Sequence, residues 1–216
     1  MISIKELSKC YQSRTILDSI SVEFSAGKII GLVGENGCGK TTLMRCICGF
    51  VRPTSGTVKV LGKVVGHDID FAPSTGMLIE TPGFLPYYSA KRNLLTLARI
   101  SGIADNKRID EVIRIVGLDP ESKKAVGKYS LGMQQRLGIA QAILENPDIL
   151  ILDEPFNALD KQGVEDIHNL LRNQRDAGKC IVLASHSTFD ISKACGEVYV
   201  FESGKLKQYS GFNRTA

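Results

Sequence analysis

A glycine-rich segment near the N-terminus has the residue types and spacing of a phosphate-binding loop. Its residues are Gly34, Glu35, Asn36, Gly37, Cys38, Gly39, Lys40 and Thr41, with Thr42 next. Glycines allow consecutive backbone N–H groups to point at phosphate oxygens, and a helix N-terminus adds a favourable dipole. The loop follows an apolar strand-like segment, residues 28–33, and precedes an expected apolar helix. This context predicts a nucleoside triphosphate site in which Lys40 contacts the terminal phosphates and Thr41 ligates Mg²⁺.

Two adjacent carboxylates farther along the chain supply groups that phosphate hydrolysis needs. Asp153 and Glu154 follow the apolar segment 149–152, which predicts a buried strand ending at both side chains. Phosphoryl transfer depends on positioning and charge neutralisation more than on covalent chemistry. We expect Asp153 to hold Mg²⁺ through water and Glu154 to polarise the attacking water. Taken alone, the pair would also fit ordinary solvated acids after a strand.

The segment just before these carboxylates resembles the signature LSGGQQQR of ATP-binding cassette (ABC) transporter ATPases. Five positions match and three depart, the matches being Ser130, Gly132, Gln134, Gln135 and Arg136 and the departures Tyr129, Leu131 and Met133. A hydroxyl and backbone N–H groups at a helix N-terminus form an anion site, so the resemblance implies that Ser130 and Gly132 bind nucleotide. A helix cap is the alternative role for Ser130. The resemblance covers essentially the whole chain.

Further positions match this family in its order along the chain. Tyr11 resembles the aromatic residue that stacks on adenine, and segment 157–160 resembles the D-loop that joins two active sites. His186, at the end of an apolar strand-like segment, resembles the histidine that senses the γ-phosphate. Glu80 stands where most members have the glutamine that helps coordinate Mg²⁺, so the same role is implied for its carboxylate. Glutamate here, with the departing signature, is similar to bacitracin and lantibiotic immunity-type exporters.

The resemblance implies an ATPase that drives a membrane exporter, with ATP and Mg²⁺ as cofactors. The expected partners are a separate transmembrane permease and a second cassette, identical or paralogous, in a head-to-tail dimer that holds two ATP molecules. No nucleic-acid partner is expected. The chain would lie at the cytoplasmic face of the membrane, and the cargo would be an antimicrobial peptide, a drug or a lipid-like molecule. Phe84, Tyr87 and Tyr88 are hypothesised to line the groove for a permease helix, with local core packing as the alternative.

Two other classes of function are weighed against the exporter. Soluble ABC proteins act on ribosomes or chromosomes, but those members carry two cassettes in one chain or long coiled coils, and neither feature is in this sequence. A GTPase or a small-molecule kinase would share the phosphate-binding loop, but the guanine-reading motif Asn-Lys-x-Asp is missing. Association with a polytopic membrane protein would separate these interpretations.

The pattern of apolar residues predicts an α/β fold. Strand-like segments at residues 2–7, 19–24 and 28–33 come first, and from residue 149 strands alternate with helices, listed here as strands 149–152, 181–184 and 198–201 and helix 161–177. Between these parts apolar residues recur at helical spacing, with Ser89 as a cap. We therefore expect a P-loop NTPase (RecA-like) core with a mainly parallel sheet, an N-terminal antiparallel β part and an inserted helical subdomain. One domain, residues 1–216, would comprise a core at about 1–79 and 147–216 and a helical subdomain at about 80–146.

Composition is that of a globular protein rather than a disordered or membrane-embedded one, with 43% hydrophobic and 23% charged residues. The net charge of +4 decides little between nucleotide, lipid and nucleic acid as partners. The apolar runs are far shorter than the roughly 20 residues of a membrane helix, and no secretory signal is seen, so the cytosol is expected. The six cysteines are expected to be reduced, and Cys46 and Cys48 fit helix packing better than a metal site.

Overall fold

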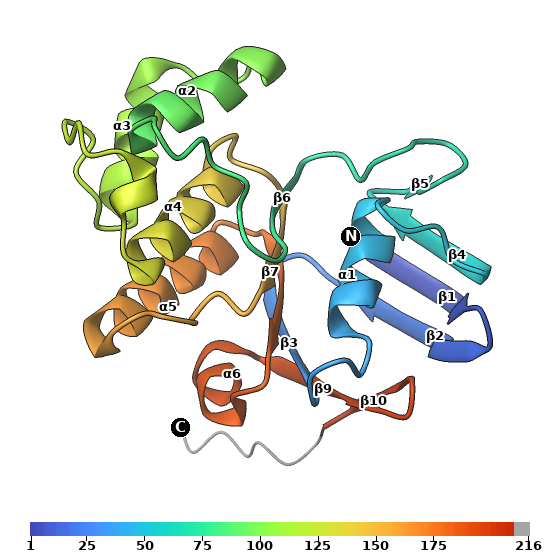
Figure 1. Cartoon of the computed structure of the whole chain (residues 1–216). Helices are drawn as coiled ribbons and strands as arrows, with labels where there is room; N and C mark the ends of the chain where they lie inside the picture. The colour runs from blue at the N-terminus through green and yellow to red at the C-terminus, as the bar shows by residue number, and fades with distance from the viewer. Residues whose placement is uncertain (210–216) are drawn as a thin grey trace.

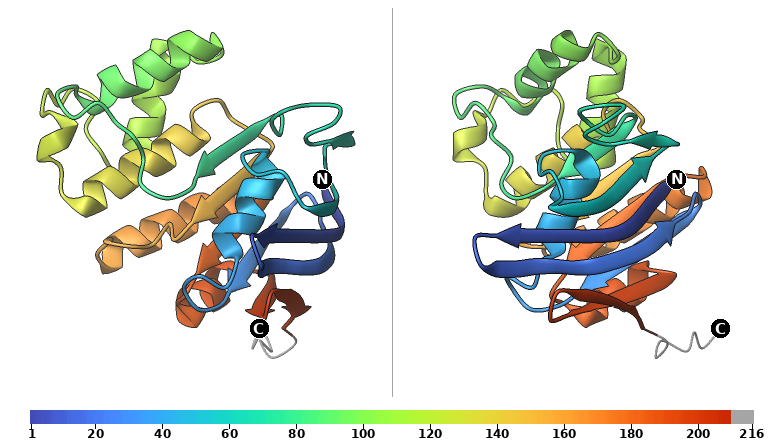
Figure 2. Two further views of the ribbon diagram at one scale, coloured as in Figure 1. Left: turned by 45° about the vertical axis from the view of Figure 1, so that its right-hand side comes forward. Right: turned by 90° about the vertical axis from the view of Figure 1, so that its right-hand side faces the viewer.

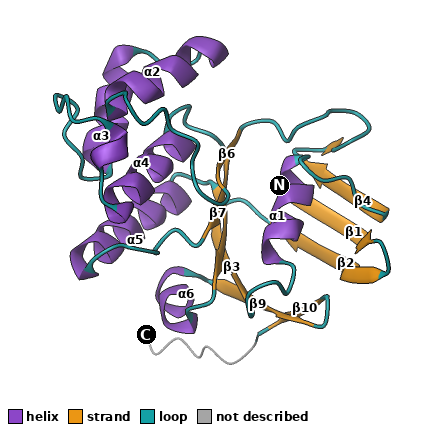
Figure 3. Cartoon of the chain, in the orientation of Figure 1, coloured by secondary structure: helices purple, strands orange, loops and turns teal. Residues whose placement is uncertain are grey.

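Two β-sheets organise the chain in a computed structural model that describes residues 1–209 (Figures 1 and 3). The first sheet contains β1 (Ile2–Tyr11), β2 (Arg14–Phe24), β4 (Ser55–Val60) and β5 (Lys63–Val64). Its strands are antiparallel, in the order β2-β1-β4-β5. The second contains β3 (Lys28–Val33), β6 (Thr75–Leu78), β7 (Ile149–Asp153), β8 (Cys180–Ser185), β9 (Glu197–Glu202) and β10 (Lys205–Gln208). Its order is β10-β9-β3-β8-β7-β6, and its strands are parallel apart from β10.

The helices are α1 (Lys40–Cys48), α2 (Ala90–Ser101), α3 (Asn106–Ile115), α4 (Leu131–Ile143), α5 (Lys161–Asp176) and α6 (Thr188–Ala194), with a 3₁₀ turn η1 (Val126–Lys128). Within residues 1–209, polar side chains cap five of them at the N-terminus. The predicted cap Ser89 accepts a hydrogen bond from the N–H of Arg92, and Asp160 does the same for Gly163 at the start of α5. These caps satisfy backbone donors that the first helical turn leaves free, which fixes where each helix begins.

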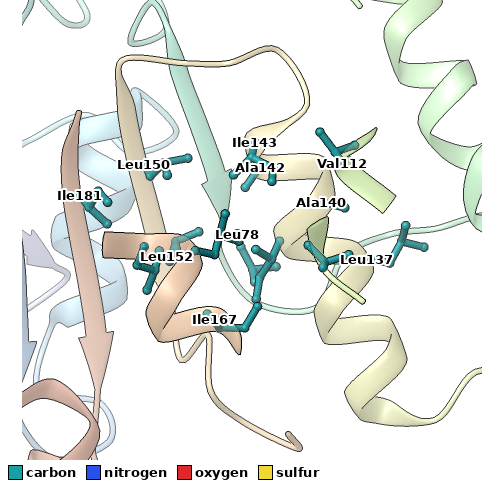
Figure 4. Close-up of a cluster of buried hydrophobic side chains, with 14 of the residues drawn as sticks. Leu78, Val112, Leu137, Ala140, Ala142, Ile143, Leu150, Leu152, Ile167 and Ile181 are labelled. Carbon is teal, nitrogen blue, oxygen red and sulfur yellow. The ribbon is translucent and has the colours of Figure 1, made fainter. Parts of the chain in front are cut away.

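The central strands of the parallel sheet are buried on both faces. On β7, Leu150 and Leu152 belong to one hydrophobic cluster, and Ile149 and Ile151 belong to another. The first cluster lies between the sheet and helices α2 to α6, and Figure 4 shows Leu152, Leu78 and Ile167 within it. The second cluster contains α1, which lies between the two sheets (Figure 2). Burial on both faces explains why these strands read as continuous apolar runs in the sequence.

Helix α4 packs directly against the edge strand β6. A side chain at Gly76 of β6 would place its Cβ 1.8 Å from the carbonyl oxygen of Ala142 in α4, so the close approach requires glycine. Helix α3 packs on α4 and α2 packs on α3, so both lie farther from the sheet (Figure 1). The packing of α4 on β6 places the loop after β6, which carries Glu80, beside the first two turns of α4.

The observed elements agree with the predicted architecture, and the sequence missed the strands that have weak apolar patterns. The first two strands extend beyond the predicted segments, and β4, β5, β6, β10 and helix α6 were not predicted. The division into a core and a helical subdomain stays a prediction, and its residues 210–216 lie outside the described residues. Within residues 1–209 no helix has both the length and the apolar character needed to cross a bilayer.

Candidate nucleotide site

The glycine-rich loop lies between β3 and α1 and closes around its own lysine. Gly39 adopts a φ of 119°, a left-handed conformation that favours glycine, immediately before the first residue of α1. The Lys40 side chain is buried, and its Nζ donates to the carbonyl oxygens of Gly34 at 2.6 Å and Glu35 at 3.1 Å. The ammonium group is therefore held inside the turn by backbone carbonyl oxygens of the loop.

A cavity of about 270 Å³ lies against this loop and brings together most of the residues predicted from the sequence. Its lining residues are Tyr11, Ile16, Asn36, Gly37, Gly39, Lys40, Thr41, Thr42, Asp153 and Glu154. Gly34, Glu35 and Cys38 belong to the loop but do not line this cavity. Tyr11 is half exposed, and the Nζ of Lys9 lies 4.8 Å from the centre of its ring. An aromatic face, a lysine and two carboxylates thus surround one hollow at the C-terminal ends of parallel strands, where ligands bind in such sheets.

Thr41 and Asp153 place two oxygen ligands side by side. The Thr41 hydroxyl donates to Oδ2 of Asp153 at 2.6 Å, which joins the first turn of α1 to the end of β7. Burial raises the pKa of Asp153; the hydrogen bond from Thr41 and the nearby Lys40 act against this shift, whereas the carboxylates of Glu154 and Glu80 add to it. A divalent cation would favour the charged form of Asp153, and hydroxyl and carboxylate oxygens are ligands that Mg²⁺ takes in proteins. The residues present therefore fit a magnesium ion.

Glu154 and His186 meet across the ends of β7 and β8. The Oε1 atom of Glu154 accepts from the backbone N–H of His186 at 2.9 Å and lies 2.8 Å from its Nδ1. The Oε2 atom accepts from the hydroxyl of Ser185 at 3.1 Å. The parallel pairing of β7 with β8 brings these residues together from positions about 30 apart in the chain. Ser185 was not singled out in the sequence, where its place at the end of an apolar strand beside His186 was the available signal.

Glu80 lies in the loop after β6, where it forms an ion pair with Arg45 in the last turn of α1. The distance between Oε1 of Glu80 and Nη2 of Arg45 is 2.5 Å, and 62% of the Glu80 side chain is exposed. A second cavity of about 330 Å³ joins Glu80 to Asp153, Glu154 and Gln135. Glu80 therefore lies within reach of the carboxylate cluster, although its strongest contact is with an arginine that the sequence pattern did not indicate.

The signature segment occupies a different position from the glycine-rich loop. Ser130 is the N-cap of α4, where its hydroxyl accepts from the N–H of Met133 at 3.2 Å. Leu131 is 73% exposed, and neither Ser130 nor Gly132 lines the cavity at the glycine-rich loop. A Cβ at Gly132 would lie 2.6 Å from the carbonyl oxygen of Ala158, so the segment packs on the 157–160 turn. The capping role of Ser130 is thus present, and its helix N-terminus is open to solvent.

Comparison with known sequences decides the family. The family described as ABC transporter matches residues 17–157, which include the glycine-rich loop, the signature segment and both carboxylates. The chain belongs to the ABC transporter family. It is 42% identical to the uncharacterized ABC transporter ATP-binding protein YybJ of Bacillus subtilis over 96% of this chain and 95% of that protein. The family predicted from the sequence is confirmed. The predicted activity is confirmed with it, since this family comprises the ATP-binding and ATP-hydrolysing subunits of ABC transporters.

Two further relatives carry functional names. The bacitracin transport ATP-binding protein BcrA of Bacillus licheniformis is 39% identical over 99% of this chain and 70% of its own length. The lantibiotic transport ATP-binding protein SrtF of Streptococcus pyogenes is 33% identical over 98% of this chain and 92% of its own length. Both belong to the group that the glutamate and the altered signature of this ABC subunit resemble.

Solved structures confirm the predicted fold class. A dimeric ATP-binding cassette in a post-hydrolysis state bound to ADP and Pi superposes with a TM-score of 0.87 and 21% identity, covering 99% of each chain. An ATP-binding subunit of an ABC transporter gives the same TM-score with 24% identity, over 96% of this chain and 88% of that one. At this level of identity the likeness establishes the α/β cassette fold of the ABC subunit.

Proposed function

We propose that this ABC subunit powers an exporter that removes an antimicrobial peptide, a drug or a lipid-like molecule through a separate permease. The names of the bacitracin and lantibiotic transport relatives support this class of cargo. Glutamate at position 80 and the Ser-Leu-Gly-Met signature are consistent with the same group. A subunit attached in this way would lie at the cytoplasmic face of the membrane, with no nucleic acid as partner.

The single observation that carries the chemistry is the meeting of Thr41 and Asp153 in the cavity at the glycine-rich loop. Asn36, Gly37, Gly39 and Thr42 line this cavity, so with Gly34, Glu35 and Cys38 of the same loop they would cradle the phosphates, and Lys40 would contact the terminal ones. Tyr11 lies at the same cavity and would stack on adenine. Thr41 and Asp153 would hold magnesium, with Glu80 as a further oxygen donor. Bound magnesium would neutralise charge on the phosphates during transfer.

Glu154 is suited to act as the general base. It reaches the same cavity, and its carboxylate is oriented by His186 and Ser185. A carboxylate held by donors on one side can accept a proton from water on the other, which is the geometry that general base catalysis requires. His186 contacts Glu154 and is 58% exposed, so it lies where a terminal phosphate could be sensed.

The open N-terminus of α4 supports a head-to-tail dimer. Ser130 and Gly132 offer a hydroxyl and backbone N–H groups, but within residues 1–209 they do not line the cavity at the glycine-rich loop. A second cassette could present its own bound nucleotide to this helix end, so that two ATP molecules would join two chains. Hydrolysis would then release the dimer and move the attached permease.

The aromatic segment after Glu80 supports a contact with the permease. Tyr87 is 70% exposed, and its ring lies 5.2 Å from that of Tyr88, over which Arg92 stacks at 3.9 Å. Phe84 packs partly against the core, so local packing accounts for that residue. An exposed tyrosine such as Tyr87 that a neighbour holds in place loses little entropy on binding, which suits it as an interface anchor.

Co-expression with a candidate permease, a polytopic membrane protein from a neighbouring reading frame, would test the proposal. We expect the two proteins to co-purify and to protect a sensitive host against bacitracin or a lantibiotic. Lys40→Ala should abolish protection, because the lysine is needed for nucleotide binding. Co-purification should stay intact, because the Lys40 side chain lies inside the loop and away from the surface. Co-sedimentation with ribosomes, together with no membrane partner, would overturn the exporter and favour a soluble ABC function.

A further inference from the structure

The amide of Gln135 links the signature helix to the backbone of the proposed catalytic base. Its Nε2 donates to the carbonyl oxygen of Glu154 at 2.9 Å, across 19 positions of the chain. Gln135 lies in the second turn of α4, and Glu154 is the first residue after β7. Both residues line the second cavity, which also contains Asp153 and Glu80. The bond therefore lies beside the reacting groups.

The backbone of Glu154 depends on such contacts because of its conformation. Its φ is 48°, a left-handed value that a non-glycine residue adopts only when its surroundings hold it. Its N–H donates to the carbonyl of Ala184 at 2.8 Å, and its carbonyl accepts from the N–H of Asn157 at 3.2 Å in addition to Gln135. These bonds fix the direction in which the Glu154 side chain leaves the backbone. Loss of one of them would alter the position of the carboxylate.

Helix α4 joins its exposed N-terminus to Gln135 through a continuous run of helical residues. Ser130 caps the helix five positions before Gln135, within the same run of helical hydrogen bonds. Next to Gln135, Arg136 donates to the carbonyl of Val116 at 2.7 Å and to Asp166 at 3.2 Å, so α4 is tied to the end of α3 and to α5. Leu137 and Ile139 are fully buried. The helix is therefore an anchored, continuous connection between its exposed end and the Glu154 carbonyl.

We infer that Gln135 is a positioning residue that couples the two nucleotides of the dimer. The inference rests on the proposed function, in which the N-terminus of α4 contacts the nucleotide held by the partner chain and Glu154 acts on the nucleotide of its own chain. Nucleotide at the partner's loop fixes α4, and the Gln135 amide passes this restraint to the backbone of Glu154. Each chain thus aligns its own base when the opposite site is filled.

Gln135→Met tests the positioning role, because methionine keeps the length and helix propensity of glutamine but lacks a donor. In the purified chain with Mg-ATP, we expect kcat for ATP to fall about tenfold while KM stays within about twofold. Gln135→Lys, which restores a donor, should recover at least half of the loss. Gln141→Met, a half-buried glutamine at the other end of α4, is the matched control and should leave both constants unchanged. An unchanged kcat in Gln135→Met would overturn the positioning role, and failure of the lysine variant to recover activity would count the same way.

A double variant tests the coupling. If Gln135 transmits the state of Ser130, combining Gln135→Met with Ser130→Ala should give a kcat no lower than that of the more impaired single variant. Losses that multiply would show that the two residues act independently, which would overturn the coupling. The role of Gln135 is tested by measuring ATP hydrolysis, whereas the exporter proposal is tested by measuring membrane association and drug protection. Either proposal can therefore fail without the other.

Discussion

The molecule presents two helix N-termini that could bind phosphate, and they differ in how the chain completes them. At the start of α1, the loop is closed by Lys40, by the Thr41 bond to Asp153 and by a cavity that contains Glu154. At the start of α4, Ser130 satisfies one backbone donor and Leu131 is 73% exposed. The first end is a nearly complete site within one chain. The second has the polar groups of a site without the lysine, which is what a half-site completed by another chain would have.

The largest effect should come from the complete site. Glu154→Gln keeps the shape of the side chain and removes its basicity, so we expect kcat for ATP to fall about 100-fold or more while Mg-ATP binding persists. The trapped state should run as a dimer in size-exclusion chromatography with Mg-ATP. Glu145→Gln, an exposed glutamate after α4, serves as control. Near-normal turnover in Glu154→Gln would remove Glu154 as the base.

The half-site should show a smaller effect that appears only in the dimer. We expect Ser130→Ala to lower kcat about tenfold, which corresponds to a rise of about 1.4 kcal/mol in activation free energy. The affinity of the isolated chain for ATP should not change. Ser89→Ala is a matched control, because Ser89 caps α2 in the same way and the loss of either cap should cost about 1 kcal/mol of stability. Equal kinetic losses in both variants would reduce the role of Ser130 to capping. Isothermal titration on monomeric protein and steady-state kinetics supply the two readouts.

The two ends also differed in how much the sequence could predict. The glycine-rich loop has fixed spacing on consecutive residues, so Gly34 to Thr42 and the strand before them were identified directly. Asp153 and Glu154 were predicted because they follow an apolar strand, and His186 was predicted from its resemblance to the family's histidine at the end of another. Arg45, Ser185 and Gln135 were missed as partners, because their contacts depend on tertiary packing between α1 and the loop after β6, between β7 and β8, and between α4 and β7. Strands β4 and β6 were missed because few of their residues are buried.

The Arg45–Glu80 pair tests how the complete site tolerates an extra carboxylate. Arg45→Gln should raise the apparent Kd for Mg-ATP roughly two- to fivefold, because an exposed ion pair contributes little and the unpaired carboxylate would repel phosphate. In a Glu80→Gln background, the same change should have almost no effect, since there is no charge to neutralise. Equal effects in both backgrounds would show that Arg45 does not act through Glu80. Fluorescent nucleotide binding at fixed Mg²⁺ gives the four affinities.

The smallest effect concerns the support beneath the segment that follows Glu154. His168 of α5 is 1% exposed, stacks on Phe156 with ring centres 4.6 Å apart, and has no hydrogen-bond partner for either ring nitrogen within the described residues. Burial lowers its pKa, with Lys193 and Arg172 acting in the same direction and Glu165 and Asp190 against it. The folded state therefore binds fewer protons than the unfolded state below about pH 6.5, so the free energy of unfolding should fall as pH drops from 7 towards the lowered pKa. His168→Phe keeps a ring against Phe156 and should make the Tm less dependent on pH, so that at about pH 5.5 its Tm lies a few degrees above that of the unchanged protein in thermal melts. The same dependence of Tm on pH in both proteins would mean that groups other than His168 cause the acid sensitivity.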